Sequence, residues 1–176
     1  IKPVLGYRFI ITGDFNGDRR SDIAYFDNST NSLKVIYSII DTLDGIDTTS
    51  GPFSFLIHND SNVNILTNNN FESGDFNGDG FDDIVINYNS TFYVSLSYIG
   101  ADGFYYFNAP QIWRPNVSIY TKILVADFDG NGRDEILTAS MNTGNQYLWR
   151  KYYTSSTNSP ITFNFSYIPG MPTTFI

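Results

Sequence analysis

Apolar and polar residues alternate along much of the chain, as they do in β-strands that bury one face. Two stretches show this alternation best, and the residues expected to share a face in them are Leu33, Val35, Tyr37 and Ile39, and Phe92, Val94, Leu96 and Tyr98. The aromatic share of 17% also favours strands. No segment has a helical period, so the pattern predicts an all-β fold.

The predicted strands fall into three units of four. They are residues 7–12, 22–26, 33–40 and 53–58 in the first unit, 63–66, 84–88, 92–99 and 104–107 in the second, and 119–125, 136–139, 146–153 and 161–167 in the third. Four-stranded units that recur at this length are typical of β-propeller blades. We therefore predict three blades, at residues 1–59, 60–117 and 118–176. Because propellers close with about 4–8 blades, we expect a longer propeller, an assembly of copies or an open stack.

One loop recurs in all three units, between the first and second predicted strands. The copies read GDFNGDRRSDI at 13–23, GDFNGDGFDDI at 74–84 and ADFDGNGRDEI at 126–136. Counted from the first Asp, oxygen-bearing side chains stand at positions 1, 3, 5 and 9, and they are Asp14, Asn16, Asp18 and Asp22; Asp75, Asn77, Asp79 and Asp83; and Asp127, Asp129, Asn131 and Glu135. Position 7 would offer a backbone carbonyl, from Arg20, Phe81 or Arg133.

This set of oxygens predicts calcium sites. Calcium takes about 6–8 oxygen ligands in a flexible shell, whereas magnesium requires a stricter octahedron. The glycines of the loop permit a tight curl that turns alternate side chains inward. Each loop holds three carboxylates, which would repel one another at close range without a cation. We expect about three calcium ions, one in each loop.

Apolar residues repeat within the same loops. Phe15, Phe76 and Phe128 stand at position 2, and Ile23, Ile84 and Ile136 at position 10. We expect these side chains to anchor each loop in the core of its blade, since burying a large apolar side chain contributes about 1.5–3 kcal/mol.

The charge of the chain fits this interpretation. The formal net charge is −8, and nine of the 18 acidic residues occupy the predicted ligand positions. With only 10 Lys and Arg, the chain is not expected to bind nucleic acid or anionic membranes. The absence of cysteine excludes disulfides, zinc–thiolate sites and thiol nucleophiles. No apolar run is long enough for a membrane span.

Two different interpretations of the loops account for the pattern less well. Asp, Asn and Gly also suit turns that hold no metal, but three aligned copies make this less attractive. An EF-hand requires Glu at position 12 and flanking helices. Position 12 is Tyr25, Ile86 or Thr138, and the flanks have strand character, so the EF-hand is rejected.

The three loops resemble the calcium loops of FG-GAP/VCBS repeats, as in the propeller of integrin α-subunits. The resemblance implies that each loop joins two strands of a blade and binds a calcium ion that stabilises the blade. The third loop departs from the pattern, with Ala126 in place of Gly and Glu135 in place of Asp. Outside the loops, no Phe-Gly opens the units and no Gly-Ala-Pro follows them.

The resemblance and the calcium sites together predict an extracellular or cell-surface module that binds a protein or a glycan. A lectin is the sharper hypothesis, with sugar-stacking candidates Trp113, Trp149, Phe104 to Phe107, Tyr152 and Tyr153. A structural subunit that self-associates through blade edges and an accessory domain of a larger enzyme are two further hypotheses. The chain itself is not expected to be an enzyme, because its single histidine, His58, has no catalytic motif around it. Five glycosylation sequons begin at Asn28, Asn59, Asn89, Asn116 and Asn164.

Overall fold

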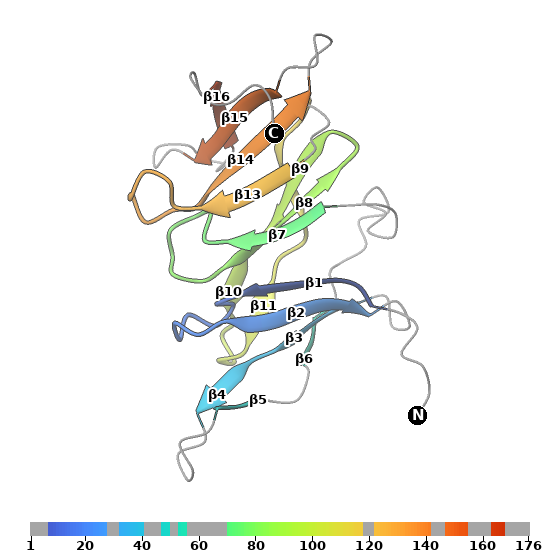
Figure 1. Ribbon diagram of the computed structural model, residues 1–176. Coiled ribbons are helices and arrows are strands. Elements are labelled where there is room, and N and C mark those ends of the chain that lie inside the picture. The colour runs from blue at the N-terminus through green and yellow to red at the C-terminus, as the bar shows by residue number, and fades with distance from the viewer. Residues whose placement is uncertain are drawn as a thin grey trace.

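A computed structural model gives the fold as a stack of antiparallel β-sheets (Figure 1). The structure describes residues 7–27, 32–40, 47–49, 53–55, 70–117, 122–141, 147–154 and 163–167. Every regular element in these residues is a β-strand, so the predicted all-β fold is confirmed. Within the same residues, no helix could cross a membrane.

The first sheet has the strand order β1-β2-β3-β6. Its strands are β1 (Tyr7–Gly13), β2 (Asp22–Asp27), β3 (Ser32–Ile36) and β6 (Phe53–Phe55). Beyond Tyr37 the chain leaves this sheet and forms a separate hairpin of β4 (Ser38–Ile40) and β5 (Asp47–Thr49). The strand predicted at 33–40 is therefore two strands in two different sheets.

The second sheet has the order β12-β9-β8-β7. Its strands are β7 (Asn70–Gly74), β8 (Asp83–Tyr88), β9 (Thr91–Ser95) and β12 (Gln111–Arg114). A tight turn joins β8 to β9 at Asn89 and Ser90, whose positive φ angles of 45° and 57° suit a two-residue hairpin turn. A separate hairpin is formed by β10 (Ser97–Ile99) and β11 (Tyr105–Phe107).

The third sheet has the order β13-β14-β15-β16. Its strands are β13 (Lys122–Ala126), β14 (Glu135–Met141), β15 (Tyr147–Thr154) and β16 (Phe163–Tyr167). All four lie close to the predicted positions. Its buried face includes Ile136 and Tyr152, which pair across β14 and β15.

The three sheets are stacked face to face, with the second in the middle (Figure 1). Two apolar clusters fill the spaces between them. The first joins Phe15, Leu33 and Val35 of the first sheet to Ile84 and Ile86 of the second. The other is formed by Phe76, Val85, Phe92, Val94, Trp113, Val117, Ile123, Ile136 and Tyr152, which come from the second and third sheets and the segment after β12. The edge strands β1, β7 and β13 lie beside one another in that order.

Two predictions in the second unit were wrong, and a third lies outside the described residues. The fourth strand of the second sheet is β12, and the aromatic run 104–107 lies in the β10–β11 hairpin instead. The strand before the second loop is β7, whereas the predicted strand at 63–66 lies outside the described residues. Tyr98 does not share the buried face of Phe92 and Val94 but is exposed on β10.

The predicted limits of the three units stay a prediction. Each four-stranded sheet takes its strands from one of the predicted ranges. The first limit, between 59 and 60, lies outside the described residues. The sheets are stacked as antiparallel layers and do not form a closed ring within the part of the chain that the structure describes.

Candidate metal centres

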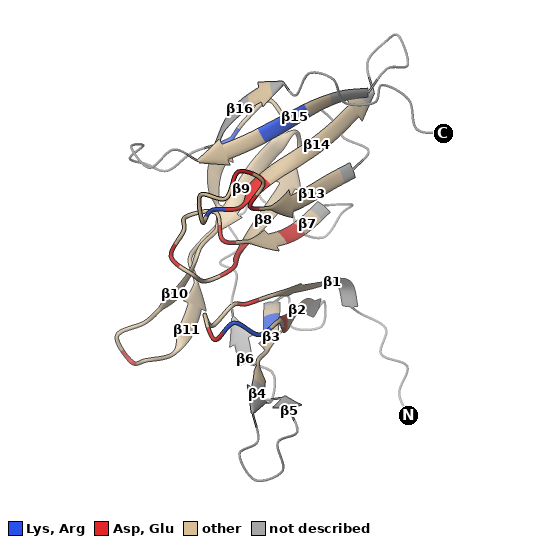
Figure 2. Ribbon diagram, turned by 60° about the vertical axis from the view of Figure 1, so that its left-hand side comes forward, with Lys and Arg blue, Asp and Glu red and all other residues tan. Residues whose placement is uncertain are grey.

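The three acidic loops lie along one side of the stack (Figure 2). Each loop joins the first two strands of a sheet: β1 to β2, β7 to β8, and β13 to β14. We call them loop 1 (residues 14–22), loop 2 (residues 75–83) and loop 3 (residues 127–135). Their common placement follows from the shared topology of the sheets, so a residue at one loop position has a counterpart in the other two.

The first Asp of each loop holds the curl through its carboxylate. In loop 2, Asp75 Oδ1 accepts hydrogen bonds from the N–H groups of Gly78 (2.7 Å) and Asp79 (3.1 Å), and Oδ2 accepts one from Gly80 (2.8 Å). Asp127 accepts the corresponding three in loop 3. The glycine at position 4 has a φ angle of 71°, 79° or 74° in the three loops, a conformation that glycine adopts without steric cost.

The acid at position 9 of loops 1 and 2 is buried beneath the loop. Asp83 Oδ2 accepts the N–H of Phe76 (3.2 Å), and Oδ1 accepts the N–H of Ser97 (2.9 Å). Asp22 makes the same pair of bonds with Phe15 (3.1 Å) and Ser38 (2.8 Å). Sequence reasoning missed the two serines, because they lie at the start of β4 and β10, outside the loops.

Burial and like charges act together on these acids. The pKa of Asp83 is raised to about 8, chiefly by burial and also by the nearby carboxylates of Asp79 and Asp75, while its two backbone hydrogen bonds act in the opposite direction. The pKa of Asp22 is raised by burial too, with smaller effects from Asp18 and Asp14. A cation near position 9 would relieve this repulsion.

Loop 3 brings three acids together most closely. Oxygens of Asp127, Asp129 and Glu135 lie within 4.8 Å of one another, a spacing that suits ligands at about 2.3–2.6 Å from one calcium ion. This is the one such group of acids among the described residues. The residues present therefore fit a divalent cation here. In the other two loops position 3 is Asn16 or Asn77, an amide that can still offer an oxygen.

A lysine enters the same group. Lys151 Nζ lies 2.7 Å from Asp129 Oδ2 and 3.5 Å from Glu135 Oε2. Lys151 pairs with Leu137 across β14 and β15, the register position that Val35 and Val94 hold in the other two sheets. Loop 3 thus differs from the other two loops in two ways. Its position 3 is an acid, Asp129, and the cationic Lys151 pairs with that acid.

The remaining predicted ligands stay predictions. The structure places Arg20, Phe81 and Arg133 at position 7, where each backbone N–H donates to the side chain at position 5. Their carbonyl oxygens are left as the predicted ligands. The predicted anchors differ more: Phe15, Phe76, Ile84 and Ile136 are buried, but Phe128 is 48% exposed and Ile23 is 39% exposed. These two predictions were wrong, because both residues lie on the outer faces of the stack.

Position 8 has a role that the sequence analysis did not assign. Asp82 Oδ2 accepts the N–H of Asp14 (2.8 Å), and the N–H of Asp82 donates to the carbonyl of Asp14 (2.8 Å). Asp134 makes the same two bonds with Asp75, at 2.9 and 2.8 Å. We call this pair of bonds the loop clasp. Its signal in the sequence was an Asp at position 8 in two of the three loops.

The aromatic candidates for sugar stacking are divided by the structure. Trp113, Tyr152 and Phe107 are buried between the sheets, so they are not free to stack on a sugar. Phe104 is 58% exposed in the turn of the β10–β11 hairpin, and Tyr98 of β10 is exposed as well. Among the sequons, Asn89 and Asn116 have exposed side chains. The side chains of Asn28, Asn59 and Asn164 lie outside the described residues.

Comparison with known proteins supports the interpretation of the loops. Residues 75–138 match the sequence model of the FG-GAP-like repeat. The matched segment begins at the first Asp of loop 2 and ends three residues after loop 3. No curated protein and no solved structure matches the chain.

Proposed function

Because residues 75–138 match the FG-GAP-like repeat, we propose that the chain is a calcium-stabilised binding or adhesion module that recognises a protein or a glycan. Its three sheets would act as propeller-type blades, a rigid support on which loops carry the ligand site. We place it outside the cell or at the cell surface, where calcium is abundant enough to fill sites of about 10⁻⁴–10⁻³ M affinity.

The calcium part of the proposal rests on one observation. Three acids of loop 3 lie within 4.8 Å of one another, on a loop whose backbone curl is repeated in loops 1 and 2. In each loop the side chains at positions 1, 3, 5 and 9 and the carbonyl at position 7 would hold the ion. Bound calcium would supply positive charge, which offsets the repulsion among the acids and fixes the curl.

The ligand part rests on the β10–β11 hairpin. Tyr98, Ile99 and Phe104 are all exposed on it, and Tyr98 lies against Tyr106 with ring centroids 5.7 Å apart. The exposed carboxylate of Asp102 accepts the N–H of Phe104 (3.1 Å). Exposed aromatic faces beside an acceptor suit either a sugar ring or an apolar side chain of a protein partner. A lectin is therefore the sharper form of the proposal.

The test is a glycan-array measurement on the folded chain, in calcium and again in EDTA. Calcium-dependent binding to a defined sugar, lost in Phe104→Ala and kept in Ile112→Ala, is the expected result for a lectin. Ile112 is a matched control because it is equally exposed but lies on β12. Absence of glycan binding in a folded sample would move the proposal to a protein ligand.

The proposal assigns no catalysis to the chain itself and no nucleic-acid partner. A role as the accessory module of a larger enzyme remains compatible with it, since such a module would also bind a ligand or a partner domain. A hydrolase screen that finds turnover by the pure chain would contradict the non-catalytic assignment.

A further inference from the structure

The two contacts between neighbouring sheets are built in the same way. At each contact, the loop phenylalanine of one sheet packs against the next sheet: Phe15 and Phe76 are both fully buried. The third copy, Phe128, lies on the outer face of the third sheet and is 48% exposed. The third sheet therefore presents the same apolar contact residue half exposed. Leu124 is exposed on the adjacent strand β13.

The opposite face of the stack carries the other half of the same contact. At each inner contact, the sheet that faces the loop phenylalanine contributes two buried residues. They are Phe71 and Ile84 in the second sheet, and Ile123 and Ile136 in the third sheet. Their counterparts in the first sheet are Ile10 and Ile23, by the register of the first two strands. These are 65% and 39% exposed. Each outer face thus repeats one side of an interface that occurs twice within the chain.

The loops add a second set of matching positions. The position-7 side chain of one loop lies over the position-4 glycine of the preceding loop. A Cβ placed on Gly17 would be 2.9 Å from the Phe81 ring, and one on Gly78 would be 3.0 Å from Arg133. On the outer face of the third sheet, a Cβ on Gly130 would meet nothing within 4 Å. The counterpart of Phe81 and Arg133 on the first sheet is Arg20.

The outer faces differ from the inner contacts at two positions that would meet on docking: the residue before the loop and the residue at position 8. Inside the stack, glycine precedes the loop, because a Cβ on Gly13 would lie 2.6 Å from Asp82 Oδ2 and one on Gly74 2.7 Å from Asp134 Oδ2. On the outer face of the third sheet this residue is Ala126, which carries a methyl group. On the outer face of the first sheet position 8 is Ser21, which is shorter than Asp. The larger residue and the smaller residue would meet if the two outer faces came together.

From this match we propose that a second copy of the chain docks head to tail, with its first sheet on the third sheet of the other copy. Phe128 would then fill the place that Phe15 and Phe76 fill inside the chain, against Ile10 and Ile23 of the second copy. Ser21 of that copy would lie beside Ala126 and take the position of the loop clasp. Such a contact is heterologous, so it closes into a ring or extends into a filament.

The charge at the contact position of this face is paired within its own chain. Lys151 stands where Val35 and Val94 stand in the inner contacts, but its ammonium is already paired with Asp129 at 2.7 Å and with Glu135 at 3.5 Å. A covered ion pair with its partner in place avoids the penalty of an isolated charge. The proposal does not depend on the ligand-binding role, because it uses neither the β10–β11 hairpin nor a bound ion.

The first test measures the mass of the chain in solution by light scattering coupled to size exclusion, across micromolar concentrations. We expect a mass of two or more copies. Phe128→Ser and Ile10→Ser should each raise the dissociation constant by about tenfold or more, as expected for a central contact residue. Ile112→Ser is the control, because Ile112 is exposed on β12 away from both outer faces. Circular dichroism checks that each variant is folded.

Two further measurements separate this docking from different modes of association. A mixture of the Phe128→Ser and Ile10→Ser variants keeps one intact face on each chain, so it should form pairs and stop there. Ser21→Asp should weaken association, because its carboxylate meets the Ala126 methyl, and Ala126→Gly in the same chain should restore it. A monomeric wild type at every concentration would overturn the proposal. The proposal would also be overturned if association survived in both serine variants, or if neither Ser21→Asp nor Ala126→Gly changed it.

Discussion

Replacement of Lys151 by methionine tests whether loop 3 is a weaker calcium site than loops 1 and 2. The ammonium lies 2.7 Å from Asp129 Oδ2 and 3.5 Å from Glu135 Oε2, and both of these acids are predicted ligands. A calcium ion in loop 3 would have to displace this cation or bind beside it. Lys151→Met keeps the length of the side chain and removes the charge, so we expect it to tighten calcium binding in loop 3.

The size of the effect follows from the charges. Two unit charges about 4 Å apart interact by about 1 kcal/mol in water and by about 4 kcal/mol at a dielectric constant of about 20. The Lys151 side chain is 21% exposed and can move toward solvent, which favours the lower end of this range. The repulsion between Lys151 and a divalent ion is twice that between unit charges, and movement of the lysine reduces it. Removing the charge should therefore improve the free energy of calcium binding by about 1–2 kcal/mol, or about tenfold in Kd.

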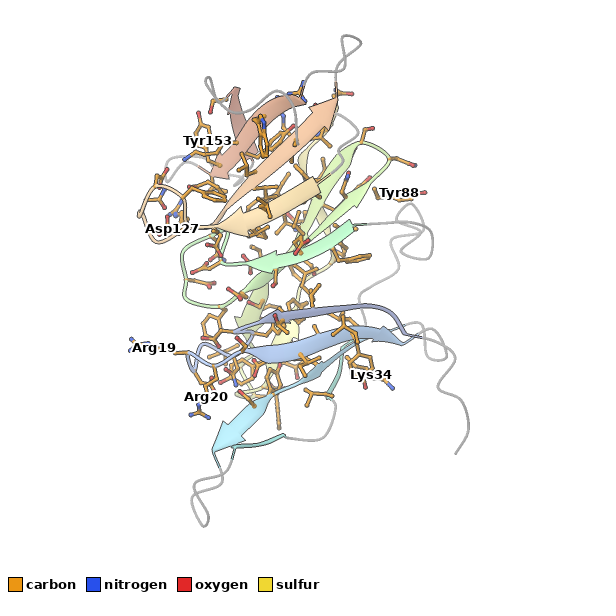
Figure 3. The ribbon with its side chains drawn as sticks, viewed as in Figure 1. Arg19, Arg20, Lys34, Tyr88, Asp127 and Tyr153 are labelled. Atoms are coloured by element: carbon orange, nitrogen blue, oxygen red, sulfur yellow. The ribbon has the colours of Figure 1, made fainter. Side chains whose placement is uncertain are left out.

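The assay is isothermal titration of the metal-free chain with calcium. The weakest class of sites should tighten about tenfold in Lys151→Met, while Lys34→Met should leave all classes unchanged. Lys34 is a suitable control because it lies on β3, on the opposite side of the stack from Asp127 (Figure 3). Asp127→Asn added to Lys151→Met should remove the tightened class. Equal behaviour of the two lysine variants would refute the reasoning.

Three further predictions concern stability. Phe76→Ala should lower the free energy of unfolding in urea by about 3–5 kcal/mol, because Phe76 is fully buried. Phe128→Ala should lower it by less than about 1 kcal/mol in the dilute monomer, because Phe128 is half exposed. Equal losses in the two variants would contradict the packing. Without calcium, the raised pKa of Asp83 means that its ionisation opposes folding, so the free energy of unfolding should fall as the pH rises from 3.8 toward about 8. Asp83→Asn should flatten the curve of melting temperature against pH. A melting temperature that rises over this range would contradict the prediction. Excess EDTA should lower the melting temperature by several degrees through loss of ligand stabilisation, and an unchanged value would count against bound calcium.

The local pattern was enough to predict most of the third sheet and the curl of the loops. Runs rich in apolar and aromatic residues, such as KILVA in β13 and FNFSY in β16, mark the strands, and the loop residues fix their own backbone through short-range bonds such as Gly78 N–H to Asp75. The second sheet was predicted less well. Its fourth strand β12 has the sequence QIWR, which carries less strand character than the aromatic run that lies in the β10–β11 hairpin. Which strand joins the sheet is decided by tertiary contact, through the burial of Trp113.

The parts of the candidate site that were missed all come from outside a single loop. Lys151 reaches loop 3 from β15, far along the chain from Asp129. Asp82 and Asp134 hold a loop of the neighbouring sheet, so their role depends on how the sheets stack. No periodicity within one unit reveals such contacts. The exposure of Phe128 has the same origin, because its motif position is identical to that of two buried residues.

The loop clasp couples neighbouring acidic loops in series. Asp82, which holds the backbone of Asp14, is followed directly by Asp83, the position-9 acid of loop 2. Asp134 stands in the same way between the backbone of Asp75 and Glu135 of loop 3. Any shift of the position-9 acid in one loop is therefore transmitted to the first residue of the preceding loop. Because each sheet is coupled to its neighbour, as in linear repeat arrays, we expect the three sheets to melt together.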